Sequence, residues 1–192
     1  MSNTFYGIGY NSKRRHKTKV NGKVSEVYKV WYSMFQRCYC PKRLKRNPSY
    51  LGCSVAKEWH DFQDFADWYE KQTHSNLGYQ LDKDILTLEN KIYSSDTCCF
   101  VPRELNMLLA ACDARRGKLP QGVDFCKQTG KYRSQISIDR VSVSLGRFDC
   151  PQKAHLVYKK AKEIHIKNKA LEWQDRVSSD VFNALMSWKL EA

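Results

Sequence analysis

The hydrophobic positions in the first third of the chain follow a helical spacing in two places. From Val27 to Cys38, apolar residues recur every three or four positions, which predicts an amphipathic helix. The same spacing over Glu58–Lys71 predicts a second helix. Between them, the stretch Pro41–Pro48 is rich in Lys and Arg and is expected to form a basic loop.

The apolar residues of the next segment form short extended runs. Residues 79–86 and 98–101 have strand-like lengths and predict two strands joined by a polar loop. Residues 104–112 return to helical spacing and follow a proline. The expected order in this part of the chain is therefore strand, loop, strand, helix.

In the last third of the chain the pattern changes to alternation. Residues 122–126, 132–138 and 141–148 predict three strands separated by turn residues. Residues 151–170 have helical spacing and begin with a proline, which suits the first helical turn. These elements predict an α+β module in which the helix covers one face of an antiparallel sheet. A final amphipathic segment, 177–188, is expected to pack on the body of the protein.

Charge changes this picture by indicating a partner. The 192 residues include 33 Lys and Arg and 20 Asp and Glu, which gives a net charge of +13. Residues 1–50 hold twelve of the basic residues and one acidic residue. Cations interleaved with aromatic side chains suit a regular row of phosphates, so Arg14 and Arg15 are expected to contact nucleic acid. A solvated basic surface and an anionic membrane surface are the alternatives.

Membrane insertion and secretion are not expected. No window approaches the ~18 consecutive apolar residues that a bilayer-spanning helix needs, and the start lacks the pattern of a secretory signal. We therefore expect a cytoplasmic location, where the eight cysteines are thiols or metal ligands. A structural Zn²⁺ site is less expected than core thiols, because paired Cys-x₂-Cys motifs are absent. Its candidate ligands are Cys38, Cys40, Cys53, Cys98 and Cys99.

Four sequence blocks stand in order in the first half of the chain: Val30–Tyr39, Val55–Trp59, Gly78–Leu86 and Asn90–Asn106. Together they resemble a phage-type branch of the HNH endonuclease superfamily. The resemblance implies a ββα hairpin that holds one divalent metal, Mg²⁺ or Mn²⁺, to stabilise charge on the cleaved phosphate. It places Asp82 and Asn106 at the metal-ligand positions, and Asp82, Lys83 and Asn90 at the catalytic positions, with Thr97 as an alternative to Asn90.

Lys83 stands where the resemblance implies a general base. A lysine stays protonated at neutral pH unless it is desolvated, so it suits a phosphate clamp better than a base. Either metal-bound water needs no protein base, or a histidine such as His60 or His74 supplies one. Two alternatives stay open. The fold could bind DNA without cleaving it, or its carboxylates could only form salt bridges across the hairpin.

A second group of blocks lies between Leu119 and about Ala170, at 119–123, 130–136 and 144–149. They resemble the APETALA / ethylene-response-factor type of DNA-binding domain, which implies a sheet laid in the major groove. Alternation places the expected DNA-contacting residues on the face away from the helix. They are Lys131, Arg133, Gln135, Ser137, Ser142 and Ser144, with Arg140 in the adjoining turn. Asp124, Cys126 and Ser137 fall where plant relatives tend to carry arginine, so the sequence preference is not transferred.

These patterns predict a chain of five segments: a basic arm (1–26), an HNH-like nuclease module (27–113), a linker (114–118), an APETALA-type module (119–170) and a C-terminal helix (171–192). The expected fold is α+β, with a ββα-metal module plus a three-stranded antiparallel sheet packed on one helix. The expected function is a phage-encoded, homing-type endonuclease that cuts double-stranded DNA in the host cytoplasm, with no small-molecule cofactor. The alternative is a non-catalytic DNA-binding regulator or host-takeover protein.

Overall fold

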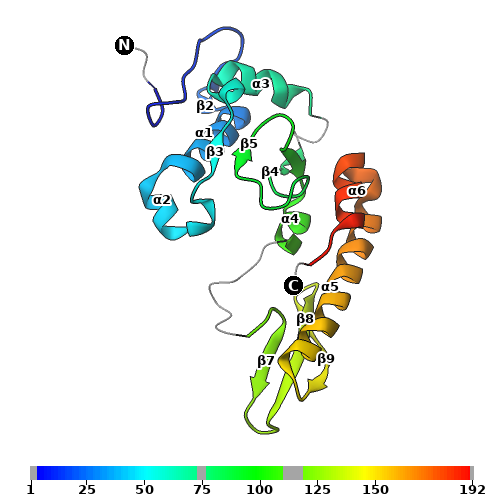
Figure 1. Ribbon diagram of the computed structural model, residues 1–192. Coiled ribbons are helices and arrows are strands. Elements are labelled where there is room, and N and C mark those ends of the chain that lie inside the picture. The colour runs from blue at the N-terminus through cyan, green and yellow to red at the C-terminus, as the bar shows by residue number, and fades with distance from the viewer. Residues whose placement is uncertain (1–3, 73–76, 110–118, 191–192) are drawn as a thin grey trace. The chain divides into compact units, whose positions relative to one another are not determined.

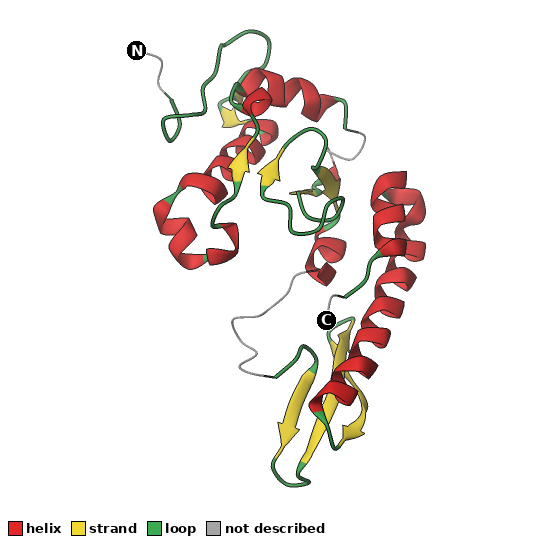
Figure 2. Cartoon of the chain, viewed as in Figure 1, coloured by secondary structure: helices red, strands yellow, loops and turns green. Residues whose placement is uncertain are grey.

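The computed structural model describes residues 4–72, 77–109 and 119–190 (Figure 1). The chain divides into two compact units, Met1–Asn106 and Met107–Ala192. Each unit combines helices with strands, as the cartoon in Figure 2 shows, so the predicted α+β class is confirmed. The predicted linker, 114–118, lies outside the described residues.

The first unit is built from short strands and helices. Strands β1 and β2 form an antiparallel hairpin, whereas β3 and β5 pair in parallel. The elements are β1 (Lys19–Val20), β2 (Lys23–Val24), α1 (Glu26–Tyr39), α2 (Pro41–Arg46), η1 (Pro48–Tyr50), β3 (Ser54–Val55), η2 (Lys57–Trp59), α3 (Phe62–Glu70), β4 (Gln80–Asp82), β5 (Ile92–Tyr93), β6 (Cys99–Val101) and α4 (Arg103–Leu109). The boundary between the two units falls within α4.

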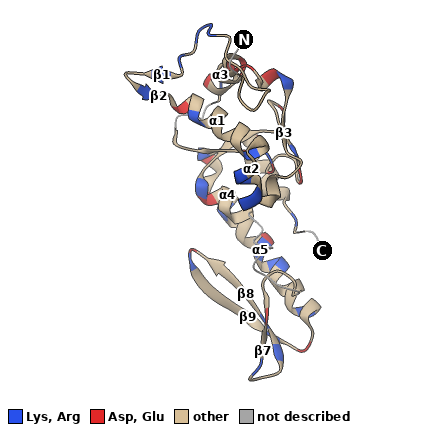
Figure 3. Ribbon diagram, turned by 90° about the vertical axis from the view of Figure 1, so that its left-hand side faces the viewer, with Lys and Arg blue, Asp and Glu red and all other residues tan. Residues whose placement is uncertain are grey.

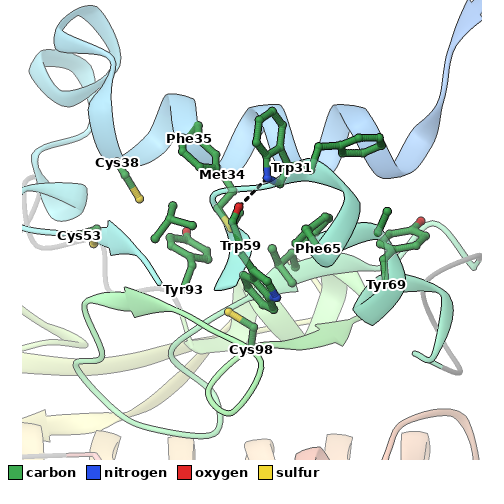
Figure 4. Close-up of a cluster of buried hydrophobic side chains, with 14 of the residues drawn as sticks. Trp31, Met34, Phe35, Cys38, Cys53, Trp59, Phe65, Tyr69, Tyr93 and Cys98 are labelled. Carbon is green, nitrogen blue, oxygen red and sulfur yellow. Dashed lines mark hydrogen bonds between the residues drawn. The ribbon is translucent and has the colours of Figure 1, made fainter. Parts of the chain in front are cut away.

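Helix α1 forms one wall of the hydrophobic core of the first unit. Its apolar residues recur at helical spacing, and Trp31, Met34 and Phe35 are fully buried. Figure 4 shows these side chains among others from later segments, including Trp59 and Tyr93. The Trp31 indole N–H donates to the Trp59 carbonyl oxygen at 2.8 Å, so the polar atom of this large ring is paired inside the core. The helix predicted for this segment is confirmed.

Two predictions about the first unit need correction. The stretch Pro41–Pro48 is not a loop, because α2 occupies most of it. Proline suits the first helical position, and the Lys, Arg and Leu residues behind it favour helix. The helix predicted for Glu58–Lys71 begins later, at Phe62. The Asp61 side chain caps that start by accepting the Gln63 backbone N–H at 3.1 Å.

Strands β4 and β6 form the predicted hairpin. They pair antiparallel, with Leu81 opposite Phe100, and both side chains are buried in the core. Helix α4 begins directly after β6. The two predicted strands and the helix are confirmed, although β4 is shorter than the predicted run 79–86. The segment predicted as a loop between them also contains β5, which pairs with β3. The assignment of this hairpin to HNH endonucleases stays a prediction.

The second unit contains a three-stranded antiparallel sheet. Strands β7 (Val123–Cys126), β8 (Lys131–Ile138) and β9 (Val141–Phe148) are hydrogen-bonded in chain order. Asp139 and Arg140 join β8 to β9 with φ angles of 49° and 68°, the two positive values typical of a type I′ hairpin turn. The three predicted strands are confirmed.

Helix α5 (Pro151–Trp173) packs against one face of this sheet. Ala154 and Tyr158 are buried there. Gly122 precedes β7 with a φ of +76°, and a Cβ at this position would lie 2.0 Å from the Tyr158 ring. Glycine therefore permits both the backbone conformation and the close approach of the helix.

Helix α6 (Ser179–Ser187) follows α5 after the turn η5 (Gln174–Arg176). It packs on α5 and buries Val181 and Leu185, which confirms the predicted final helix. Its start is capped by Ser178, whose hydroxyl accepts the Val181 N–H at 3.4 Å. Within the described ranges, no helix has both the length and the apolar character needed to span a bilayer.

Candidate nucleic-acid interface

Asp82 ends strand β4 and caps the turn that follows. Its Oδ1 accepts the backbone N–H groups of Asp84 and Ile85, each at 2.8 Å. Burial is the largest influence on this carboxyl group, and it raises the pKa above the usual range. One oxygen of Asp82 is therefore committed to the backbone, at a place where ionisation is disfavoured.

Lys83 points into the protein. The residue is 5% exposed, and its ammonium group donates to Asp84 Oδ1 and to the Asn90 carbonyl oxygen, both at 2.5 Å. The ammonium also lies 5.9 Å from the centre of the Tyr93 ring. Lys83 therefore holds the two ends of the loop after β4 together, and little of its charge is accessible to a phosphate in solution.

Asn90 braces the same loop from the other side. Its Nδ2 donates to the carbonyl oxygens of Lys83 at 2.9 Å and Ile92 at 2.6 Å, and its Oδ1 accepts the Ile92 N–H at 3.0 Å. The structure thus brings together the three residues predicted to be catalytic, Asp82, Lys83 and Asn90. Each of them has a role in holding the loop.

Asn106 approaches the hairpin from helix α4. Its Nδ2 donates to Gln80 Oε1 at 3.0 Å. Gln80 and Asp82 are two positions apart on β4, so the alternation of a strand places them on the same face. The second predicted metal ligand therefore contacts the strand that carries the first.

The side chains around Asp82 fit a divalent cation poorly. Mg²⁺ is usually bound by freely accessible carboxylate oxygens, whereas Asp82 Oδ1 already accepts two backbone N–H groups and the carboxyl group lies near the positive charges of Lys83 and Arg37. Across the described ranges, no three His, Cys, Asp or Glu side chains are grouped as metal ligands. The donor set present here is better explained by the hydrogen bonds that hold the loop.

The buried cysteines are better explained as core residues than as a zinc site. Burial raises the pKa of both the Cys38 and the Cys98 thiols to about 12, so they stay protonated at neutral pH. Zinc binds the deprotonated thiolate. Figure 4 shows both side chains, together with Cys53, among the hydrophobic residues of the first unit.

Residues 11–16 of the N-terminal arm lie along helix α3. The Gln63 side-chain oxygen accepts the backbone N–H of Arg15 at 2.9 Å and that of His16 at 2.7 Å. The Arg14 and Arg15 guanidinium groups form ion pairs with acidic residues of α3 and its cap. The partners are Asp61 and Asp64 for Arg14, and Asp67 and Glu70 for Arg15. Acidic residues of the same unit therefore already neutralise the two arginines predicted to contact DNA.

Helix α2 presents a cationic surface in the stretch that the sequence predicts to be a loop. With 3.6 residues per turn, its four cations fall on less than half of the helix circumference, and Leu44 lies opposite them. Leu44 is half-buried and the cations are exposed. Figure 3 shows this positive charge on α2. The cations are Lys42, Arg43, Lys45 and Arg46, and none of them has an ion-pair partner among the residues that the structure describes.

The face of the sheet away from α5 is open and polar. Cross-strand pairing places Gln135 beside Ser144, and Ser137 beside Ser142. The three serines are exposed, and the Ser142 hydroxyl donates to Gln135 Oε1 at 3.5 Å. Arg140 is exposed in the turn at the end of the same strands. The structure therefore brings these predicted DNA-binding residues together on one side of the sheet.

Arg133 lies at the centre of a row that crosses all three strands. Its cross-strand neighbours are Asp124 on β7 and Arg147 on β9. Arg133 Nε donates to Asp124 Oδ1 at 3.1 Å and Nη2 donates to Oδ2 at 2.7 Å, and these bonds raise the pKa of Arg133. Lys131, the remaining predicted contact, pairs with Asp149 at 3.3 Å.

Arg147 belongs to the open face, although strict alternation along β9 excludes it. The strand register shifts between Ser134 and Gln135, where Leu145 is the extra residue of a β-bulge. The bulge reverses the alternation after Ser144 and turns Arg147 to the open face. The glycine after Leu145 is the signal that sequence analysis missed, because an isolated glycine in a strand often marks a bulge.

No family model, no curated protein and no solved structure matches this chain. The resemblances to HNH endonucleases and to APETALA-type domains therefore remain predictions from the sequence. The geometry of the sheet and the distribution of charge are the observations that bear on function.

Proposed function

We propose that this protein binds double-stranded DNA through the open face of the sheet β7–β9. The observation that carries the proposal is the row of hydrogen-bonding side chains on β8 and β9, of which Ser144 and Arg147 are exposed and Arg133 and Gln135 are partly exposed. Helix α5 covers the other face, so the sheet offers a polar surface on a rigid support.

The dimensions and chemistry of this surface suit the major groove. That groove is about 12 Å wide and admits a two-stranded antiparallel ribbon. Arginine pairs with the acceptor edge of guanine, glutamine pairs with adenine, and serine contacts several bases. The β8–β9 hairpin presents all three residue types on one side.

Helix α2 would add phosphate contacts from the first unit. Its cations are exposed to solvent, and cations that neutralise phosphates release counterions from DNA. Arg14 and Arg15, in contrast, are already paired with carboxylates. The net charge of +13 would also favour association with a polyanion. The sheet would select the sequence and α2 would strengthen binding to any duplex.

A binding titration tests this proposal. Full-length protein is titrated into a fluorescently labelled duplex at several salt concentrations, and anisotropy is recorded. Arg147→Ala should weaken binding several-fold. Lys160→Ala is the control, because it removes the same charge from an exposed position of α5, the helix on the opposite side of the sheet, and it should have little effect. Absence of binding at low salt, or equal loss for the two variants, would contradict the proposal.

Phosphodiester cleavage is a second candidate function, favoured by one observation. The β4–β6 hairpin is followed directly by α4, with Asp82 at the end of β4 and Asn106 on α4. A supercoiled plasmid incubated with the full chain and Mg²⁺ or Mn²⁺, and separately with chelator, tests it. Nicking that requires the metal and is lost in Asp82→Asn would support the endonuclease. If the plasmid stays intact under all conditions, the endonuclease proposal is wrong and the protein is a DNA-binding protein without nuclease activity.

A further inference from the structure

We propose that Asp124 is a positioning residue that aims Arg133 at a guanine in the major groove. This inference rests on the proposed function, because it assumes that the open face meets duplex DNA. It adds a division of roles within the sheet. Asp124 would orient the guanidinium group without contacting the base, and Arg133 would make the contact.

The geometry of the ion pair leaves the necessary donors available. Asp124 is bound by Nε and Nη2, which form the side edge of the guanidinium group. The end edge, formed by Nη1 and the second hydrogen of Nη2, is not used by this pair. A guanidinium group has five N–H donors, so Arg133 can bind a carboxylate sideways and a base end-on at the same time.

The surroundings of Arg133 restrict its side chain. Asp124 and Arg147 lie directly across from it on the two neighbouring strands. The carboxylate attracts the guanidinium group and the second arginine repels it, so both neighbours favour the same orientation. The side chains of Arg133 and Asp124 are 42% and 41% exposed, which leaves the pair open to a ligand. Orienting Arg133 before binding reduces the rotamer entropy lost on contact.

The charge of the pair favours bases over phosphates. The Asp124 carboxylate offsets the positive charge of Arg133, and this weakens any attraction to a phosphate. The free end edge still offers two parallel N–H donors. Guanine presents two acceptors, N7 and O6, to such an edge, whereas adenine presents an acceptor beside a donor. The arrangement therefore selects guanine.

Selection from a randomised duplex pool, using the full-length protein, would first identify a preferred sequence. Affinity is then measured for that duplex and for duplexes in which each guanine is replaced in turn. The unmodified protein should prefer guanine at one position by about tenfold or more. Arg133→Ala should remove that preference. Asp124→Asn should reduce it to below about threefold while leaving affinity for unrelated duplexes nearly unchanged, and Asp124→Glu should retain part of it.

Asp149→Asn is the matched control, because Asp149 forms an exposed ion pair with Lys131 in the same unit and does not contact Arg133. It should keep the guanine preference. If Asp124→Asn instead strengthens binding to every duplex alike, Asp124 only neutralises Arg133 and the inference is wrong. Binding without any guanine preference would also overturn it, while leaving the proposed function intact. Failure to bind any duplex would overturn the proposed function itself, and circular dichroism would establish that each variant is folded.

Discussion

At the scale of single residues, Asp82, Lys83 and Asn90 have the sequence pattern of a catalytic site, but their observed contacts hold a loop together. Lys83 is buried against Asp84 and the Asn90 carbonyl oxygen. A buried ammonium group needs such partners to offset the cost of its desolvation. The contacts that explain why Lys83 is tolerated here therefore also keep its charge away from solvent.

Asp82 gives a prediction that separates these roles. Its pKa is raised in the folded protein, so the protonated form stabilises the fold and the ionised form costs stability at neutral pH. Asp82→Asn keeps the oxygen that accepts the two N–H groups and removes the charge. It should therefore raise the free energy of unfolding at pH 7, and this gain should shrink as the pH falls below the raised pKa and be absent below the ordinary carboxyl value of 3.8.

Urea unfolding of both proteins between pH 3 and pH 7 measures this difference. Asp82→Ala is the control, because it removes both the charge and the oxygen atom that accepts the hydrogen bonds. The backbone N–H groups of Asp84 and Ile85 then have no side-chain acceptor. That variant should lose ~1–3 kcal/mol at pH 7. If the difference in unfolding free energy between Asp82→Asn and the unmodified protein does not change with pH, the pKa of Asp82 is not raised by burial.

At the scale of elements, the segments that the sequence predicts correctly are those whose ends are marked by turn or capping residues. The β8–β9 hairpin is predictable because alternating residues meet at Asp139 and Arg140, which adopt the positive φ angles of a tight turn. Helix α2 is not predicted, because its short cationic sequence lacks a repeated apolar face and Leu44 alone contributes burial. The register of β9 is also missed, since one bulge residue reverses the alternation and hides Arg147.

The same limit applies to the candidate site. The residues predicted for the sheet lie on one face, because alternation is a property of the strand itself. The pairing of Arg14 and Arg15 with α3 could not be predicted, since it brings together residues about fifty positions apart. Spacing likewise brings Asp82, Lys83 and Asn90 into one loop, but it does not reveal which way each side chain points.

Gly122 gives a prediction about the packing of α5 on the sheet. Gly122→Ala should strain the backbone, whose φ is +76°, and should force the Tyr158 ring out of its place. Gly130 has a similar φ of +66° but open space around it, so Gly130→Ala carries only the backbone cost. We expect Gly122→Ala to destabilise the fold by ~1–3 kcal/mol more than Gly130→Ala. Equal thermal shifts for the two variants would contradict the close packing.

A charge comparison tests the different roles of α2 and the arm. Replacing Lys42, Arg43, Lys45 and Arg46 by glutamine should weaken DNA binding and flatten its dependence on salt, by up to about 0.9 in the logarithmic slope for each cation that contacts a phosphate. Arg14→Gln combined with Arg15→Gln should change the slope less, because these cations are already paired with acidic residues. A larger effect for the arm than for α2 would reverse this assignment.

At the scale of the whole molecule, positive charge is present in both units but is arranged differently in each. In the first unit Arg14 and Arg15 of the arm form ion pairs with acidic residues of α3, whereas the cations of α2 are exposed. In the second unit the open face of the sheet combines Arg133 and Arg147 with uncharged hydrogen-bonding groups such as Gln135 and Ser144. This distribution fits a protein that gains affinity from one unit and sequence preference from the other.

The most direct test of DNA binding by the sheet is a proton–nitrogen correlation spectrum of the full-length protein, recorded before and after addition of a short duplex. The Nε–H signals of Arg133 and Arg147 report on the open face. We expect these two signals and the amide signals of β8, β9 and α2 to shift, while those of the arm and α3 stay in place. Shifts confined to the loop around Lys83, with the sheet signals unchanged, would contradict the account.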